Sequence, residues 1–115
     1  MPRQSIFDMT FSKVYPMLIQ KAERKGRTRA EVDEVTSWLT GYTAEQITAA
    51  LDSDITNGSF FANAPAWNPR ADLITGRICG IQVETIEDPM MKMIRQLDKL
   101  VDELAKGKPM EKVIR

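Results

Sequence analysis

The side chains best suited to chemistry in this sequence lie between residues 67 and 88. The single cysteine, Cys79, follows Arg77 by two positions, and a neighbouring positive charge favours the reactive thiolate form of a cysteine. The chain contains no histidine that would serve this thiol as a general base. A lone cysteine is more often a small buried hydrophobic residue. The sequence therefore identifies no catalytic residue, and a small enzyme that uses Cys79 or carboxylates is kept as an alternative.

Three carboxylates, those of Glu84, Glu87 and Asp88, gather before the last expected helix. Hard cations take oxygen ligands from such clusters, but the spacing matches no calcium-binding loop. Asp88 is better explained as a helix N-cap, and Glu87 as a negative charge near the positive end of a helix. We therefore predict no metal site and no cofactor.

A loop shaped by two prolines carries Trp67, Asn68 and Arg70. An aromatic face, an amide and a guanidinium together form the kind of surface that holds a ligand or a partner. The alternative is that Trp67 fills the core and Arg70 caps a neighbouring helix end. With Arg77 and Cys79, these three residues are the binding candidates.

Function classes are limited by what the sequence lacks. The absence of histidine excludes the Ser-His-Asp triad, the Cys-His pair and histidine-ligated metals. Lys+Arg and Asp+Glu are both 16, so no net charge attracts nucleic acid, and the basic cluster at 21–29 is typical of a solvated helix end. The sequence favours a non-enzymatic module that binds a protein or a small molecule.

Chain length and residue usage point to one domain in a reducing compartment. A chain of 115 residues, 43% of them hydrophobic, is long enough for one core, so we expect a single domain over 1–115. The lone cysteine and the N-terminus, which has no secretory pattern, predict a cytoplasmic protein. No apolar run approaches the roughly 20 residues that cross a membrane.

Helix signals divide most of the chain into four main helices. Two of them begin with capping boxes, in which a threonine and the acid or amide three residues later bond each other's backbone N–H groups. The four expected helices span 12–25 (or 16–25, beginning at Pro16), 28–41, 43–51 and 88–107, with a turn at Asn57-Gly58 and short helical turns at 59–62 and 69–76. The fold prediction is a mainly α protein, a small orthogonal bundle of these four helices.

The last helix has the clearest pattern. Asp88 caps it and Pro89 opens it, and an apolar stripe runs along it through Met90, Ile94, Leu97, Val101 and Leu104. The stripe follows a heptad repeat for about two heptads, fewer than a coiled coil requires. Packing within the subunit is therefore favoured, and a homodimer seam is the alternative.

Two further features leave alternatives open. The helices on either side of Gly41 have the outline of a helix-turn-helix DNA-binding regulator, but the second exposes Glu45, Asp52 and Asp54, which would repel phosphates. The segment 78–86 alternates like a strand, and its one available partner is the N-terminal region. A minor two-stranded pairing of residues 4–9 with 78–83 is therefore included in the fold prediction, although an isolated pair is marginally stable.

Several strings in this sequence are familiar as a set. They are Val14-Tyr15-Pro16, Lys25-Gly26-Arg27-Thr28, Trp38-Leu39-Thr40-Gly41-Tyr42, Phe60-Phe61-Ala62-Asn63-Ala64-Pro65, Ile86-Glu87-Asp88-Pro89, and the run from Leu97 to Gly107. The chain resembles, over nearly its whole length, the bacterial family catalogued as domain of unknown function 2200. The resemblance implies a mainly helical single domain of bacterial origin, and it implies no activity, cofactor or catalytic residue.

Overall fold

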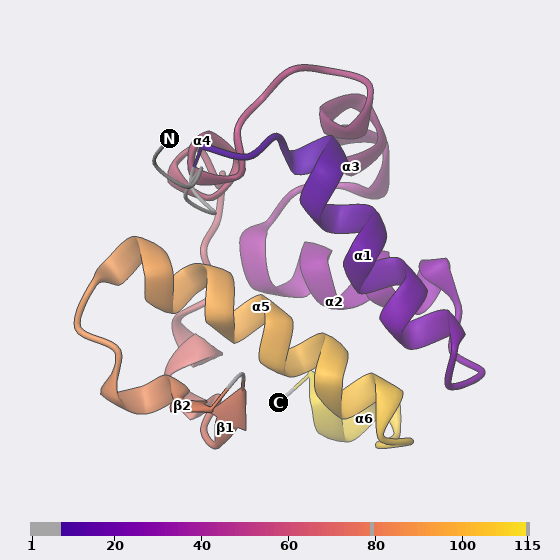
Figure 1. Cartoon of the computed structure of the whole chain (residues 1–115), viewed down its shortest axis with the longest axis vertical. Coiled ribbons are helices and arrows are strands. Elements are labelled where there is room, and N and C mark those ends of the chain that lie inside the picture. Colours follow the sequence, from indigo (N-terminus) through magenta and orange to yellow (C-terminus); the bar gives the residue numbers. More distant parts are fainter. Residues whose placement is uncertain (1–7, 79, 115) are drawn as a thin grey trace.

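One long helix, α5, runs through the middle of the molecule, and the other elements pack around it (Figure 1). The structure is a computed structural model that describes residues 8–78 and 80–114. Its elements in chain order are α1 (Phe11–Glu23), α2 (Arg29–Thr40), α3 (Ala44–Leu51), α4 (Asn57–Ala62), the 3₁₀ turn η1 (Pro69–Leu73), β1 (Arg77–Ile78), β2 (Ile81–Gln82), the 3₁₀ turn η2 (Val83–Thr85), α5 (Pro89–Ala105) and α6 (Met110–Val113). The protein is mainly α, as the sequence predicts.

The predicted helix caps are confirmed. The side chains of Thr28 and Thr43 accept hydrogen bonds from the backbone N–H groups of Glu31 and Gln46, and both capping boxes are complete. Asp88 accepts from the N–H groups of two residues at the start of α5, where Pro89 is the first helical residue. These ends are set by local chemistry, because each cap satisfies backbone donors that the helix itself leaves unpaired.

The predicted start of α1 near residue 12 is confirmed to within one residue, whereas the alternative start at Pro16 and the predicted turn at the start of α4 are wrong. α1 begins at Phe11 and continues through Pro16, which removes one backbone hydrogen bond in its second turn without ending the helix. Asn57 and Gly58, predicted as a turn, are the first two residues of α4. Thr56 caps that helix, because its hydroxyl accepts from the N–H of Ser59 at 3.1 Å.

A minor two-stranded pairing is present, but the predicted pairing with residues 8 and 9 is wrong. Arg77 pairs with Gln82 and Ile78 with Ile81, in a short antiparallel hairpin. Residues 8–10 lie instead beside residues 55–57: Asn57 N donates to Met9 O at 2.7 Å, and Phe11 N to Ile55 O at 2.9 Å. The hairpin forms locally because Gly80, with φ +79°, reverses the chain where only two residues separate the strands. Residues 4–7 of the predicted pair lie outside the described residues.

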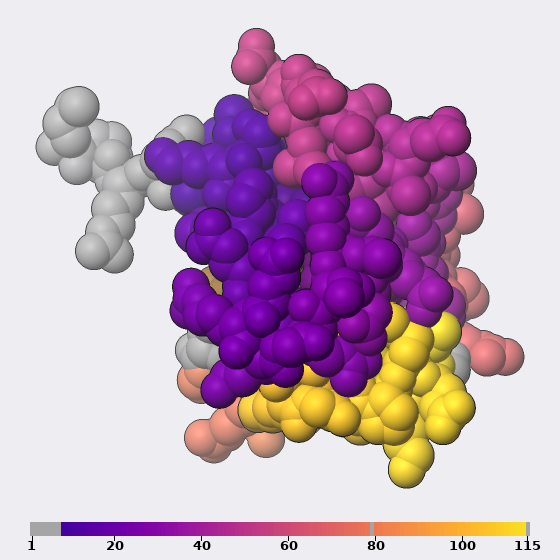
Figure 2. All heavy atoms as spheres, turned by 90° about the vertical axis from the view of Figure 1, so that its right-hand side faces the viewer, coloured from indigo at the N-terminus to yellow at the C-terminus, as the bar shows by residue number. Residues whose placement is uncertain are grey.

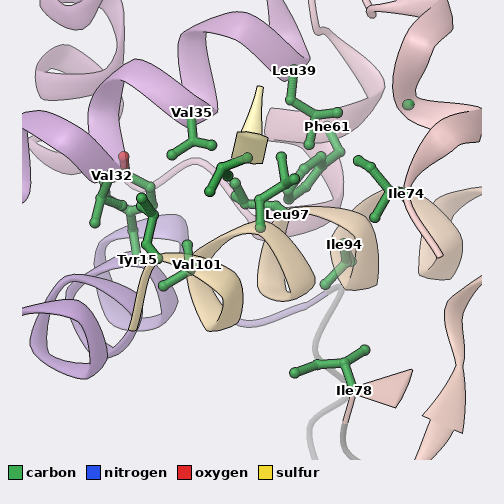
Figure 3. Close-up of a cluster of buried hydrophobic side chains, with 14 of the residues drawn as sticks. Tyr15, Val32, Val35, Leu39, Phe61, Ile74, Ile78, Ile94, Leu97 and Val101 are labelled. Atoms are coloured by element: carbon green, nitrogen blue, oxygen red, sulfur yellow. The ribbon is translucent and has the colours of Figure 1, made fainter. Parts of the chain in front are cut away.

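The core lies where α1, α2, α4 and α5 meet (Figure 3). The apolar stripe of α5 is used there, since Ile94, Leu97, Val101 and Leu104 are all buried within the subunit. The interpretation of this stripe as internal packing is therefore confirmed for these four residues. Below the core, α6 covers the end of α5 and buries Val113, an element that the sequence analysis missed.

Ion pairs tie α1 to α5 along their outer edge. Lys21 Nζ lies 3.7 Å from Asp98 and 3.3 Å from Asp102, and Asp102 is also 3.1 Å from Lys106. Burial tends to raise the pKa of Asp102, but the hydrogen bonds and positive charges of Lys106 and Lys21 outweigh it and lower that pKa. Figure 2 shows the face that lies on the right in Figure 1, with the N-terminal helices across it and the C-terminal segment along its lower edge.

Candidate functional site

The loop that carries Trp67 is fastened to the C-terminal end of α2. The last carbonyls of a helix have no partner within the helix, and here a distant loop provides it. Three hydrogen bonds form this junction: Ala66 N to Thr40 O at 3.1 Å, Asn68 N to Leu39 O at 2.9 Å, and Asn68 Nδ2 to Trp38 O at 3.1 Å. The loop is thereby held in a fixed position on the helix end.

Gly41 makes this junction geometrically feasible. It follows α2 with φ +84°, a left-handed conformation that favours glycine. A Cβ atom on this residue would lie 2.6 Å from Ala66 Cβ and 2.7 Å from Ala66 N. The glycine therefore both turns the chain and leaves room for the loop to reach the helix carbonyls.

Trp67 itself is half-buried. Its ring meets Phe61 edge-on, with 6.2 Å between the ring centroids, and so it packs against the edge of the core. The remaining part of the side chain borders an open groove of about 280 Å³, whose lining residues are Trp67, Asp72, Pro89, Lys92, Met93 and Gln96. The groove lies between the Trp67 loop with η1 and the first turns of α5, and it combines apolar walls with one charge of each sign.

Of the four predicted binding residues that the structure describes, only Trp67 lines this groove. Asn68 has a structural role. Its Oδ1 accepts a hydrogen bond from Arg70 N at 2.8 Å and so caps the start of η1, the short helical turn predicted from residue 69. Arg70 and Arg77 are exposed, and the carbonyl of Arg77 accepts a hydrogen bond from Lys99 Nζ at 3.1 Å. Cys79 lies outside the described residues.

The carbonyls at the end of α2 receive their hydrogen bonds from Ala66 and Asn68 of the Trp67 loop. The ring of Trp67 both contacts the core and borders the groove, so the two interpretations of this residue are compatible.

Five residues of the groove were not predicted as site residues: Asp72, Pro89, Lys92, Met93 and Gln96. Gln96 is buried, and its Nε2 donates to Ala71 O at 3.1 Å, which joins α5 to η1 along the floor of the groove. The cluster of methionines at the start of α5 was a usable signal for Met93, since methionine is common at adaptable binding surfaces. No local pattern distinguishes Gln96 from an exposed helix residue.

Two of the three carboxylates before α5, those of Glu84 and Asp88, accept hydrogen bonds from the backbone. Glu84 accepts from Gly76 N at 3.0 Å, and hydrogen bonds from its own N–H and from Gly76 N lower the pKa of this carboxyl group. Asp88 accepts from Met90 N and Met91 N. Across 8–78 and 80–114, no group of three or more potential ligand side chains is placed to hold a metal ion.

The basic cluster at 21–29 is largely neutralised by carboxylates. Arg27 lies 2.6 Å from Glu31, Arg29 lies 3.4 Å from Asp33, and Lys21 bridges to α5. The predicted DNA-reading helix, α3, exposes Glu45 and Gln46. Because these basic side chains are paired with carboxylates and α3 exposes an acidic residue, this surface lacks the positive charge that phosphate binding requires.

The comparisons with known proteins agree with a mainly α bacterial protein. The chain belongs to the family described as uncharacterised proteins conserved in bacteria, domain of unknown function 2200, whose model matches residues 5–115. Among solved structures it is similar to the crystal structure of the uncharacterised protein SP1917, with 50% sequence identity and a TM-score of 0.93. That match covers 98% of this chain and 93% of the other. No curated protein matches the sequence.

These comparisons confirm the family resemblance and the fold, and they assign no activity. In the part of the chain that the structure describes, no helix is both long enough and apolar enough to span a bilayer.

Proposed function

We propose that this protein is a non-enzymatic interaction module of the cytoplasm that binds a segment of a partner protein in the groove beside Trp67. The observation that carries the proposal is a rigidly presented aromatic ring at a groove edge. Three hydrogen bonds hold the loop, and Phe61 supports the ring. An aromatic residue that is already ordered loses little conformational freedom on binding, which is why such residues dominate the energetics of interfaces.

The shape of the groove favours a polypeptide over a small molecule. Typical small-molecule sites are concavities of about 300–1,000 Å³ that enclose most of the ligand surface. This groove measures about 280 Å³ and is open to solvent along its length. A chain segment that inserts one side chain and continues across the surface suits that geometry better.

Charge defines the chemistry of the segment. Trp67, Pro89 and Met93 offer apolar contact, while Lys92 and Asp72 offer one charge of each sign. The matching segment has an apolar anchor side chain, an acidic residue that meets Lys92 and a basic residue that meets Asp72. Complementary charges of this kind set orientation and partner choice more than total affinity.

The test is selection from a random library of displayed nine-residue peptides against the Trp38→Phe variant. That variant leaves Trp67 as the one tryptophan of a chain that has two, so its fluorescence reports on the groove. We expect the selected peptides to contain an apolar residue near an acidic one, and to shift the emission of Trp67.

Charge reversal provides the control. Lys92→Glu is expected to weaken these peptides by about tenfold, since an attractive charge contact becomes repulsive. Lys25→Glu, which changes an exposed lysine outside the groove lining, is expected to leave affinity unchanged. Peptides that bind wild type, Lys92→Glu and Asp72→Lys equally, or that leave Trp67 emission unaltered, would contradict the proposal.

A further inference from the structure

A second, smaller pocket lies on another side of α5, where this helix meets α1 and α4. Its volume is about 40 Å³. Apart from Asn57 and Asp98, its lining is apolar or aromatic: Phe11, Val14, Tyr15, Leu18, Phe61, Ile94 and Leu97. The groove proposed above and this pocket share no lining residue, so the two sites can be tested separately.

Asn57 is the unusual residue of this pocket. Its side chain is a primary amide, it is only 2% exposed, and its Nδ2 donates to no partner within residues 8–78 and 80–114. The backbone of Asn57 is fixed, because its N–H donates to Met9 O at 2.7 Å and it is the first residue of α4. Buried donors nearly always find an acceptor, so an orphaned one at the wall of a pocket indicates where an acceptor from outside would bind.

The other polar groups of the pocket limit the chemistry of that acceptor. The Tyr15 hydroxyl is already used, since it donates to Asp33 Oδ1 at 2.6 Å and shares a hydrogen bond with Thr36 Oγ1 at 3.0 Å. Asp98 adds a carboxylate, which lies 3.3 Å from Arg95 and 3.7 Å from Lys21. A ligand therefore meets a donor at Asn57 and an acceptor at Asp98, between apolar walls.

We propose that this pocket binds the head group of a small neutral ligand, a primary amide or an alcohol on a short aliphatic chain. Such a group has an oxygen that accepts from Asn57 Nδ2 and an N–H or O–H that donates to Asp98. The volume accommodates a head of two or three heavy atoms, and the aliphatic part contacts Val14, Leu18 and Ile94. An anionic head satisfies Asn57 but is repelled by Asp98, and an ammonium head leaves Asn57 unpaired.

The experiment is a titration of the wild-type protein, followed by NMR, with four probes of equal chain length: butyramide, 1-butanol, butyrate and butylammonium. The side-chain NH₂ signals of Asn57 and the methyl signals of Val14, Leu18 and Ile94 report on the pocket. We expect these signals to move together with butyramide and 1-butanol, which bind about tenfold more tightly than the two charged probes.

Variants test the assigned roles. Asn57→Leu, similar in shape but without the donor, is expected to weaken butyramide about tenfold, in line with the loss of a hydrogen bond from a buried group. Asp98→Asn is expected to bring butyrate close to butyramide in affinity. Asn63→Ala, an exposed asparagine just after the same helix, serves as the matched control and is expected to change neither.

The wild-type titration tests the proposal even if a variant fails to fold. If the Asn57 signals respond to none of the four probes at their highest soluble concentrations, the proposal is wrong. It is equally wrong if they show contact only with a long-lived water that no probe displaces, because the pocket then holds an ordered water only.

Discussion

The end of α2 and the start of α4 treat their polar groups in opposite ways. At the end of α2, three backbone carbonyls that the helix leaves unpaired receive hydrogen bonds from the Trp67 loop. At the start of α4, the side-chain amide of Asn57 is buried, and its Nδ2 donates to no partner among the residues that the structure describes. The first junction is complete and fixes a shape, whereas the second leaves a donor that an acceptor from outside would satisfy.

The largest expected effect is at the completed junction. Gly41→Ala is expected to lower the free energy of unfolding by about 3 kcal/mol, since it combines left-handed strain with overlap against Ala66. Gly26→Ala is the matched control: Gly26 has nearly the same φ, +83°, and no atom within 4 Å of the added Cβ. Its expected cost is about 1 kcal/mol, from strain alone.

Urea unfolding of both variants measures the difference. Equal losses for Gly41→Ala and Gly26→Ala would show that the close approach of Ala66 adds nothing to the cost of the substitution. The junction would then not be a tightly packed contact.

A smaller effect is expected at Asn68, which serves the junction twice. Asn68→Ala removes both the cap of η1 and the bond to Trp38 O, and we expect a loss of about 2 kcal/mol in thermal unfolding. Asn68→Ser keeps an oxygen for the cap and loses only the bond to Trp38 O, so about 1 kcal/mol is expected. If serine costs as much as alanine, the bond to Trp38 O carries the whole contribution and the cap carries none.

The smallest effects are expected at Asn57, where two substitutions change the free energy of unfolding in opposite directions. Asn57→Leu is expected to raise the free energy of unfolding by up to about 1 kcal/mol, because it removes a buried donor that has no partner. Asn57→Ala is expected to lower it by about 1 kcal/mol, since truncation enlarges the pocket. A clear loss of stability for the leucine variant, measured in urea, would mean that the amide stabilises the fold and would erase the contrast between the two regions.

Local chemistry explains which parts of the fold were predictable. The caps at Thr28, Thr43 and Asp88 bond only to residues two or three positions away, so the sequence contains everything that sets them. The start of α4 has a local cap in Thr56 as well, but its first N–H, that of Asn57, donates to the distant Met9, and Asn57-Gly58 alone has the composition of a turn. α6 was missed because a proline shortly after the predicted helix end at residue 107 is typical of a helix stop, whereas Pro109 immediately precedes the next helix.

The candidate sites divide in the same way. Trp67 was predictable from its residue type and its proline-rich surroundings. Lys92 and Gln96 were not, because only the packing of α5 decides which of its faces meets the Trp67 loop. The orphaned amide of Asn57 was hidden for a further reason: an unsatisfied hydrogen bond is a property of a folded neighbourhood and has no signature in a sequence.

The first turns of α5 border both the groove and the pocket, and this limits how the sequence can change there. Lys92, Met93 and Gln96 border the groove, while Ile94, Leu97 and Asp98 line the pocket on another side of the same helix. An α-helix turns by about 100° per residue, so one inserted or deleted residue here would rotate every later side chain away from its site. In relatives that retain both sites, we therefore expect substitutions between residues 92 and 98 but no insertion or deletion there.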